Sequence, residues 1–500
     1  MTTSISHRFY SNISWNMFGK AGVLIVSLIL SVFITRYLGK EHYGVYASIL
    51  VVPAFFRLLN SLGFETVLNK SIPEFNVNDP STRKSRYLLQ RMFGLRFAST
   101  VLCSIIIYVG LPFYFELISL PHLITFRPTI IFYFAVTSIN SLYSTLFMTL
   151  LRYKVSALLE LGAYLLNLAL LVIFIYLNRS ILGVFEAYII ATGFNLAVYL
   201  FLSTRDFKGE VEKPDITGLG DLAKTSYLAS IFCFGLLTQS DLFLMNYFHV
   251  SMEKVGFYQL SATIGTMLTF ILMGIQPMAL SLFSETFTQS SSEGLKKSWS
   301  LIVTFSLLFS LPIYIFVFYN AGELLSLVYG EVFTGAEPTL RLFLIFLMVR
   351  ALTGADFYGI TLYAIKKNSM VLRSTVEGSV LNIVINILLI PRYAEFGAMM
   401  GTGISVLFIA ARRFPLIRKH FPFTNVIKTA FNCILLSTAG LFPIIFISLT
   451  WQTNVVLNLA CYLITIMGLL YKIKPLHRDQ INLIEKQFPF ISPWVLPFSR

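Results

Sequence analysis

The stretch that decides the fold is residues 13–46, ISWNMFGKAGVLIVSLILSVFITRYLGKEHYGVY. It opens with an apolar run from Ile13 to Thr35, crosses a short polar break, and begins a second apolar run at Tyr43. A membrane-spanning helix needs about 20 predominantly apolar residues, and the first run has this length. Because the run lacks a small-residue cleavage site, it predicts a retained first span and not a signal peptide.

The same alternation of apolar runs and short gaps continues along the 500 residues. Apolar residues make up 56% of the chain and charged residues only 12%, so most of the chain must lie in lipid. The gaps are too short for a soluble domain, and the working part must therefore lie inside the membrane. We predict an all-α polytopic membrane protein with about fourteen transmembrane helices, near 13–35, 43–65, 92–115, 127–150, 155–177, 181–202, 225–248, 255–280, 299–319, 338–365, 370–391, 397–417, 427–449 and 453–471.

Lysine and arginine gather in every second gap. If the N-terminus is cytoplasmic, 27 of the 38 basic residues fall in cytoplasmic segments and seven lie in or beside the outer gaps. Basic residues resist translocation, so this asymmetry predicts that both termini are cytoplasmic. The formal net charge of +14 is explained by this topology and does not indicate a nucleic-acid partner.

The chain also repeats itself at offsets of 212 to 215 residues. Tyr43-Gly44-Val45-Tyr46 returns as Val255-Gly256-Phe257-Tyr258, and Asn167 returns as Asn382. An even number of helices per copy gives both copies the same orientation, so we expect two lobes around a central cavity. The predicted parts are an N-terminal lobe of helices 1–6 (1–205), a cytoplasmic linker (206–224), a C-terminal lobe of helices 7–12 (225–420), helices 13 and 14 (421–472) and a cytoplasmic tail (473–500).

Several short motifs follow one another in a fixed order. They are Trp15-Asn16 with Gly19, Thr35-Arg36-Tyr37-Leu38-Gly39, Tyr43-Gly44-Val45-Tyr46, Leu62-Gly63-Phe64, Val380-Leu381-Asn382, Ile390-Pro391-Arg392-Tyr393 and Gly397-Ala398. Over roughly residues 8–420 this ordered set resembles the polysaccharide flippases of the Wzx type, which share the MOP superfamily with lipid II flippases and MATE drug exporters.

The resemblance implies a transporter of the bacterial inner membrane. Its substrate would be undecaprenyl-diphosphate-linked oligosaccharide, moved between leaflets by alternating access for O-antigen, lipopolysaccharide or another surface polysaccharide. Membrane lipids would surround the protein, and a polysaccharide polymerase and chain-length proteins are further candidates for partners.

Three cations lie inside predicted helices. Arg57 is fourteen residues into helix 2, Arg350 twelve residues into helix 10, and Lys20 seven residues into helix 1. A charge at mid-membrane costs at least about 2.5–3.5 kcal/mol on insertion scales, so each one needs an explanation. We predict that they line a wet cavity and bind the diphosphate of the lipid carrier, because the arginine fork makes bidentate contacts with phosphate oxygens. The alternative is a set of ion pairs, for example with Asp241 or Asp356.

Four carboxylates are candidates for coupling or gating. Asp241 lies in the polar run Gln239-Ser240-Asp241, which a lipid-facing surface would not accept; it could bind a coupling proton or Na⁺, pair with an arginine of the first lobe, or contact sugar hydroxyls. Asp356 is a second such candidate. Glu160 and Glu377 hold matching places near the cytoplasmic ends of helices 5 and 11, which favours a structural role in closing a cytoplasmic gate. Arg96 lies near a predicted helix start, where we expect interfacial anchoring.

Other functions remain open at this point. A cation-coupled exporter of small molecules, as in the MATE proteins, would have a cavity dominated by acidic residues, whereas the deepest charges here are Arg57 and Arg350. A glycosyltransferase or polymerase would need a catalytic constellation, and none stands out in the sequence; we therefore expect no enzyme activity, no metal centre and no cofactor beyond a coupling H⁺ or Na⁺. A pure scaffold for sugar-assembly enzymes would not require buried arginine. The four cysteines lie in apolar runs without metal-ligand spacing, so we expect buried thiols.

Overall fold

The computed structural model describes residues 2–78, 82–150, 152–177, 180–214, 219–270, eight positions within 271–291, and 292–421, 423–450 and 454–473. Within these residues every regular element is helical, and ten helices are long and apolar enough to cross a membrane. The predicted fold class, an all-α polytopic membrane protein, is confirmed. Part of the predicted linker (215–218) and the predicted tail from residue 474 lie outside the described residues.

The described chain forms two compact units, and the predicted division into lobes stays a prediction. Unit 1 holds the residues up to Gln259 together with Ser379–Thr402, and unit 2 holds Leu260–Gly378 and the residues from Gly403 onward. The elements that lie in unit 1 are α1 (Thr2–Leu59), α2 (Phe64–Asn78), α3 (Arg83–Leu117), η1 (Pro121–Phe126), α4 (Arg127–Thr149), α5 (Tyr153–Tyr176), α6 (Ser180–Phe207), α7 (Leu219–Ser230), the π-helical η2 (Ile231–Gln239), α8 (Ser240–Tyr247), the first half of α9 (Met252–Leu268) and the middle of α15 (Asn368–His420).

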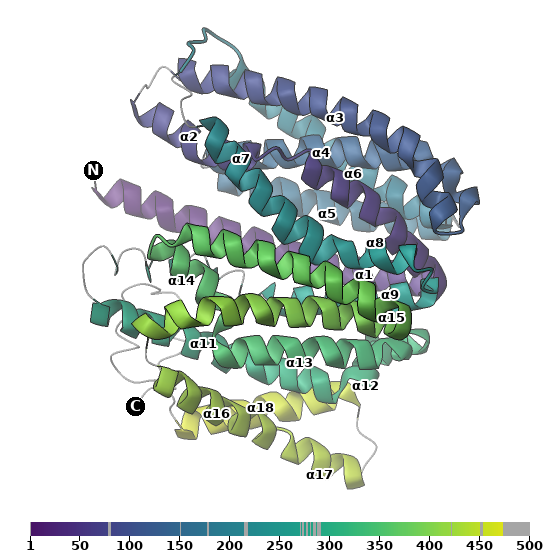
Figure 1. Ribbon diagram of the computed structural model, residues 1–500, viewed down its shortest axis with the longest axis vertical. Helices are drawn as coiled ribbons and strands as arrows, with labels where there is room; N and C mark the ends of the chain where they lie inside the picture. Colours follow the sequence, from purple (N-terminus) through teal and green to yellow (C-terminus); the bar gives the residue numbers. More distant parts are fainter. Residues whose placement is uncertain are drawn as a thin grey trace. The chain divides into compact units, whose positions relative to one another are not determined.

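Unit 1 is held together by long helix–helix contacts. Helix α5 packs against α1 on one side and α6 on the other, and α6 also packs against α4; Figure 1 shows α4, α5 and α6 close together. A core formed by α2, α3, α4 and α6 buries Leu68, Leu89, Leu146 and Tyr199. These helices present apolar side chains to lipid as well as to one another. The hydrophobic effect alone therefore cannot hold them together, and close van der Waals packing must contribute.

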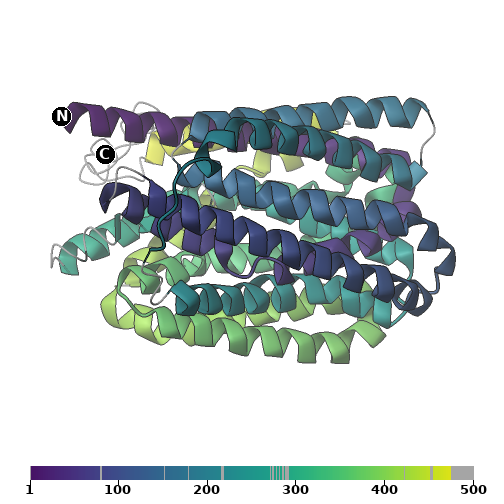
Figure 2. The ribbon, with the colours of Figure 1, turned by 90° about the horizontal axis from the view of Figure 1, so that it is seen from above.

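A single residue bends α1. Gly39 has φ 70° and ψ 175°, whereas the residues on both sides of it are helical. Glycine adopts positive φ without the steric cost that a Cβ brings, so the chain can change direction here without a loop. Figures 1 and 2 show the two arms of α1 leaving this bend in different directions.

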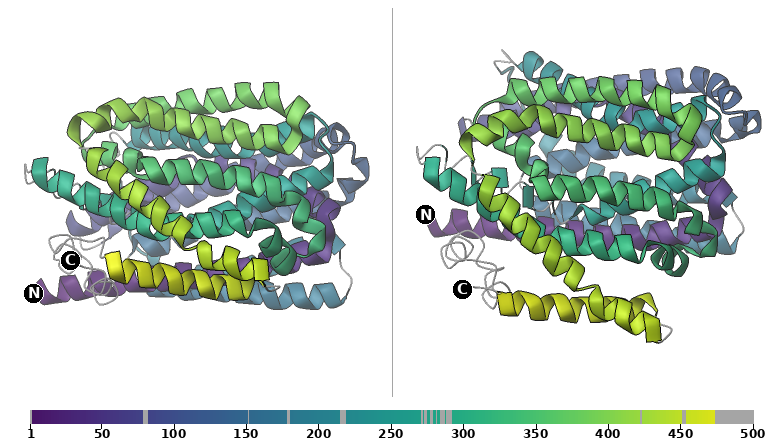
Figure 3. Two further views of the ribbon diagram at one scale, coloured as in Figure 1. Left: turned by 90° about the horizontal axis from the view of Figure 1, so that it is seen from below. Right: turned by 60° about the horizontal axis from the view of Figure 1, so that its bottom comes forward.

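Unit 2 contains the rest of α9 and α15 and the C-terminal helices. Its other elements are α11 (Ser292–Tyr319), α12 (Ala321–Tyr329), η3 (Glu331–Ala336), α13 (Glu337–Thr353), η4 (Ala355–Phe357), α14 (Tyr358–Ala364), α16 (Phe423–Ala439), α17 (Phe442–Thr450) and α18 (Val455–Ile473). Helix α16 packs against α11, and α18 against α17, as Figure 3 shows for the yellow end of the chain. Tyr462 of α18 donates to the Pro312 carbonyl of α11 at 3.0 Å, which ties these two helices together.

The predicted count of fourteen spans is not confirmed. Among the described residues, α1 and α15 each cover two predicted spans, because only Gly39 and Ala394 interrupt their helical backbone. The predicted helix near 225–248 is divided into α7, η2 and α8, and the one near 255–280 lies partly outside the described residues. The single helix predicted near 338–365 was wrong, since Gly354 at φ 69° ends α13.

Candidate functional site

Two predicted cations lie at nearly equal distances along the chain from the bend in α1. Lys20 precedes Gly39 by 19 residues and Arg57 follows it by 18. At about 1.5 Å of rise per residue, both lie roughly 27–28 Å from the bend along their arms. Both residues are exposed, and they lie on the two arms of the same helix.

Small residues position Glu160 next to Lys20. A Cβ on Gly19 would lie 3.1 Å from the Cα of Ala157, and one on Gly22 would lie 3.0 Å from a methyl of Leu161, so α5 approaches the first arm of α1 closely. Glu160 lies between these two contacts in the sequence and is exposed. The Lys20 ammonium and the Glu160 carboxylate are near enough to interact electrostatically. The sequence predicts both residues as site residues, but it does not indicate that they lie close together.

Three tyrosines are close enough to Arg57 to interact with it electrostatically. Its guanidinium lies within electrostatic range of the phenols of Tyr133, Tyr164 and Tyr188, from α4, α5 and α6. The rings of Tyr133 and Tyr188 lie 5.0 Å apart between centroids. We call Lys20, Arg57, Glu160, Tyr133, Tyr164 and Tyr188 the Arg57 cluster. It combines a phosphate-binding side chain with aromatic surfaces and hydroxyls, the groups that recognise a sugar phosphate.

Arg57 is not neutralised by a neighbouring acid. In the part of the chain that the structure describes, no carboxylate forms an ion pair with Arg57. The predicted helix over 43–65 ends earlier, at Leu59, so Arg57 lies in the last turn of α1 and not deep within a span, and its exposed guanidinium needs less compensation than a buried charge would. The ion-pair alternative for Arg57 thus finds no partner among these residues, and its guanidinium can accept an external anion.

Asp241 lies at the centre of a second polar cluster in unit 1. It is fully buried, and it accepts hydrogen bonds from the hydroxyls of Tyr258 and Thr402 and from Asn386 Nδ2, the last at 2.6 Å. Asn382 Nδ2, in the amide orientation that satisfies its neighbours, lies 3.2 Å from Asp241 Oδ1. We call these five residues the Asp241 cluster.

The Asp241 cluster contains several side-chain oxygen atoms, and none of its five members is cationic. Its donors to the carboxylate are all neutral, and the predicted pairing of Asp241 with an arginine is not found among the described residues. Asn386 Oδ1 is also buried, with no hydrogen-bond donor in the described chain. These hydrogen bonds stabilise the buried carboxylate, and a proton or a bound cation would neutralise the charge that no cationic side chain offsets among these residues. The π-helical turns of η2 end two residues before Asp241, and π-turns are frequent at functional sites.

Arg350 and Asp356 form an ion pair in unit 2. The guanidinium of Arg350 donates to Asp356 Oδ1 across the break between α13 and η4. The side chain of Asp356 is 4% exposed and that of Arg350 is 29% exposed. The pairing alternative is therefore observed for Arg350, and its role in substrate binding stays a prediction.

Glu377 is held by two arginines. Its carboxylate accepts from Arg373 Nε at 2.9 Å and from Arg412 Nε at 2.7 Å, so it links two turns of α15 that are far apart in sequence. The predicted role of Glu377 in closing a cytoplasmic gate stays a prediction. Within the described residues, no three His, Cys, Asp or Glu side chains gather as metal ligands.

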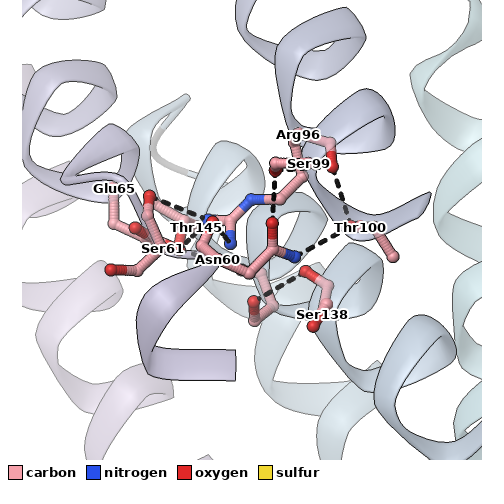
Figure 4. Close-up of polar contacts among 9 residues, drawn as sticks. Asn60, Ser61, Glu65, Arg96, Ser99, Thr100, Ser138 and Thr145 are labelled. Atoms are coloured by element: carbon pink, nitrogen blue, oxygen red, sulfur yellow. Dashed lines mark hydrogen bonds and ion pairs between the residues drawn. The ribbon is translucent and has the colours of Figure 1, made fainter. Parts of the chain in front are cut away.

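Arg96 forms a buried network that the sequence analysis missed. Helix α3 begins at Arg83 and not near residue 92, so Arg96 lies thirteen residues into it and is 1% exposed; the predicted interfacial anchoring was wrong. Arg96 Nη1 donates to the Asn60 carbonyl at 2.6 Å, and Nη2 pairs with Glu65 (Figure 4). Asn60 Nδ2 in turn donates to Thr100 Oγ1 at 2.8 Å. The available signal was the polar pair Asn60-Ser61 followed by Glu65, within a segment predicted to be membrane-spanning.

The two copies of the repeated motif meet inside unit 1. A Cβ on Gly44 would overlap the Met252 carbonyl, and one on Gly256 would lie 2.6 Å from the Lys40 carbonyl, so the two backbones touch at the glycines. Beside this crossing, Lys40 Nζ pairs with Glu253 Oε1 at 2.7 Å. In the predicted orientation the crossing lies on the outer side of the membrane. It joins the segments that begin predicted helices 2 and 8.

A family model and solved structures match this chain. The family model, described as polysaccharide biosynthesis protein, matches residues 33–338. The lipid II flippase MurJ in an inward closed conformation is 12% identical, with a TM-score of 0.72 over 91% of this chain and 98% of that chain. No curated protein sequence matches this chain.

Two further structures share the fold. An inward-facing MATE multidrug resistance transporter of the MOP superfamily is 14% identical, with a TM-score of 0.65 over 79% of this chain and 95% of that chain. A MOP superfamily transporter from Pyrococcus furiosus is 13% identical, with a TM-score of 0.54 over 82% of this chain and 94% of that chain. At these identities the likeness establishes the fold alone, which is that of the MOP flippases and transporters.

Proposed function

Because the chain belongs to the polysaccharide biosynthesis protein family, we propose that it flips undecaprenyl-diphosphate-linked oligosaccharide across a bacterial inner membrane by alternating access. The flipped unit would supply O-antigen or another surface polysaccharide, and both termini would lie in the cytoplasm. A polysaccharide polymerase and chain-length proteins would act on the product in the outer leaflet. The observation that carries the proposal is the Arg57 cluster.

The chemistry of the Arg57 cluster fits a sugar diphosphate. Arg57 has no ion-pair partner among the described residues, so its charge is available to a diphosphate. Lys20, which interacts electrostatically with Glu160, adds a second positive charge, while Glu160 limits the net charge of the cluster. Tyr133, Tyr164 and Tyr188 offer flat faces and hydroxyls to sugar rings.

Transport against a gradient needs a source of free energy, which we assign to the Asp241 cluster. A coupling proton or Na⁺ bound there would neutralise the buried carboxylate, and the unpaired Asn386 Oδ1 would serve as a further oxygen ligand for Na⁺. Release of the cation would leave an uncompensated buried charge and so favour another conformation. The Asp241 cluster therefore supports cation coupling more directly than sugar binding.

The alternative function is cation-coupled export of small molecules, which the shared MATE fold permits. An exporter of cationic compounds would expose acidic groups to its cargo. Here the exposed cluster presents two cations, Arg57 and Lys20, and one carboxylate, Glu160, whereas the carboxylate of Asp241 is buried. An anionic substrate fits this arrangement better.

The test of the proposed function is complementation of a flippase-deleted bacterium that carries matching sugar-assembly genes. The wild type should restore surface polysaccharide, and Arg57→Ala should reduce it at least about tenfold, since losing a charge-assisted hydrogen bond costs about 1.5–3 kcal/mol. Arg91→Ala is the matched control, because Arg91 is an exposed arginine of α3 that contacts Tyr87. Full activity of Arg57→Ala at equal protein level would refute the phosphate-binding role, and failure of the wild type with every sugar-assembly set would favour the exporter.

A further inference from the structure

An apolar pocket lies in unit 1, on the other side of the second arm of α1 from the tyrosines. It has a volume of about 450 Å³ and lies between α1, α3, η2, α8 and Ile383 of α15. Apart from Tyr114, Gln239 and Ser240, its walls are aliphatic, aromatic or glycine. This volume is in the range of pockets that enclose a drug-sized ligand.

The walls of the pocket offer few free polar groups. The Tyr114 hydroxyl donates to the Ser48 carbonyl at 2.8 Å and accepts from Asn246 at 2.9 Å. Ser240 Oγ donates to the Leu236 carbonyl at 2.5 Å. Apart from the Gln239 amide, the walls would give a polar ligand no replacement for its hydrogen bonds to water, so the pocket favours a hydrocarbon.

The pocket adjoins the Arg57 cluster through Phe56. Phe56 lines the pocket, and its ring also packs edge-on against Phe134 of α4, at 6.4 Å between centroids. Phe134 follows Tyr133 of the Arg57 cluster, just as Arg57 follows Phe56. Successive residues of a helix lie about 100° apart around its axis, so Phe56 is the wall residue that extends from the pocket toward the face of Arg57, whereas Val52 and Phe55 lie on the opposite face. An amphiphile with an anionic head and a hydrocarbon tail could contact the cluster and the pocket at once.

We propose that this pocket binds a segment of the isoprenoid chain of the lipid carrier while the carrier's diphosphate contacts Arg57. The proposal rests on the proposed function, because it takes the same substrate and assigns a site to its tail. Phe55, Ile106 and Phe243 are exposed at the pocket, so the rest of the chain can continue from it into the bilayer. The pocket thus selects the carrier by its tail, while the Arg57 cluster selects the head group.

Gly110 allows the pocket to be filled without disturbing its walls. It lines the pocket, and a Cβ at this position would meet no atom within 4 Å. Gly110→Phe therefore places a ring in the space proposed for the isoprenoid chain. Gly94→Phe is the matched control, because Gly94 lies on the same helix, also has open space at its Cβ, and does not line the pocket.

The experiment measures binding of three probes to the purified full-length protein in mixed micelles: undecaprenyl diphosphate, isopentenyl diphosphate and phosphatidylglycerol. Gly110→Phe should weaken binding of undecaprenyl diphosphate at least about tenfold, or about 1.4 kcal/mol, and leave isopentenyl diphosphate unchanged. Arg57→Ala should weaken both diphosphates, and Gly94→Phe neither.

Other outcomes separate the two proposals. Unchanged affinity of Gly110→Phe for undecaprenyl diphosphate would overturn the tail site, while a loss in Arg57→Ala would leave the proposed function standing. A Gly110→Phe defect confined to phosphatidylglycerol would assign the pocket to bulk lipid and overturn the proposal as well. If Arg57→Ala binds both diphosphates like the wild type, the proposed function itself fails.

A second experiment uses the unmodified protein and needs no variant. A photoreactive undecaprenyl diphosphate should label residues 106–114 or 236–244. If it labels only other residues, the tail site is contradicted.

Discussion

At the scale of single residues, Asp241 is the side chain whose surroundings restrict its function most. Four neutral side chains converge on its carboxylate, and its burial is complete. Sequence could predict that Asp241 avoids lipid, because a charged residue in a polar run does not face hydrocarbon. It could not predict the partners, since Tyr258, Asn386 and Thr402 lie on helices whose packing the periodicity does not determine.

We predict that Na⁺ stabilises the wild type through Asp241. A cation that binds only the folded state adds about 2.7 kcal/mol at 100 times its Kd, so the melting temperature should rise when NaCl replaces choline chloride at equal ionic strength. Asp241→Asn should remove this difference, because the amide keeps the size of the side chain but carries no charge.

Glu253→Gln is the control for the Asp241 prediction, since Glu253 is a half-exposed carboxylate paired with Lys40 and should not change the Na⁺ effect. If Na⁺ has no effect on the wild type but transport requires a pH gradient, the coupling ion is a proton. Activity that needs neither Na⁺ nor a pH gradient, with Asp241→Asn fully active, would contradict coupling at this site.

At the scale of elements, the Arg96 network fixes the turn between α1 and α2. Leu62 and Gly63 both have positive φ there, at 50° and 72°, and the Cβ of any larger residue at position 63 would overlap the Ala223 carbonyl. Arg96 binds the carbonyls of Asn60 and Ser61 at the start of this turn. The network thus holds α2 against α3. Both helices contribute to the apolar core that they share with α4.

We predict that Arg96→Met destabilises the protein by about 3 kcal/mol, the lower end for breaking a buried ion pair, because Glu65 is 31% exposed and keeps some contact with water. The measurement is thermal or denaturant unfolding of the detergent-solubilised protein. Arg91→Met, one turn and a half earlier on the exposed side of α3, should change stability by less than about 0.5 kcal/mol. Equal stability of the two variants would show that the Arg96 network contributes little.

Elements also show where prediction from sequence stops. Apolar runs located most of the helices, because a membrane span must satisfy its own backbone hydrogen bonds over a fixed length. Helix α2 was missed since its 15 residues are mixed in polarity and too short to span. Lys20, Arg57 and Glu160 were each predicted as site residues, but their grouping depends on the bend at Gly39 and on the close approach at Gly19, which only the three-dimensional packing shows.

At the scale of the whole molecule, alternating access requires that one closed side of the transporter opens. The contact between Gly44 and Gly256 joins the two copies of the internal repeat, and it lies on the predicted outer side. Two copies with the same orientation can rock against each other about such a crossing. Lys40 and Glu253, paired beside it, are both partly exposed and so accessible to reagents.

We predict that a cleavable bis-maleimide joining the thiols of a Lys40→Cys, Glu253→Cys variant stops transport, because the crossing can no longer separate, and that cleaving the linker restores it. The measurement is flipping of a labelled lipid-linked oligosaccharide in proteoliposomes before and after cleavage.

The matched control is Arg152→Cys with Asp206→Cys, which replaces an ion pair of similar length at 2.8 Å between the start of α5 and the last turn of α6. Both helices belong to the predicted N-terminal lobe, so linking them should leave transport unchanged. If the linked Lys40→Cys, Glu253→Cys variant transports at the rate of the unlinked one, the crossing does not open during the cycle and the outward step must occur elsewhere.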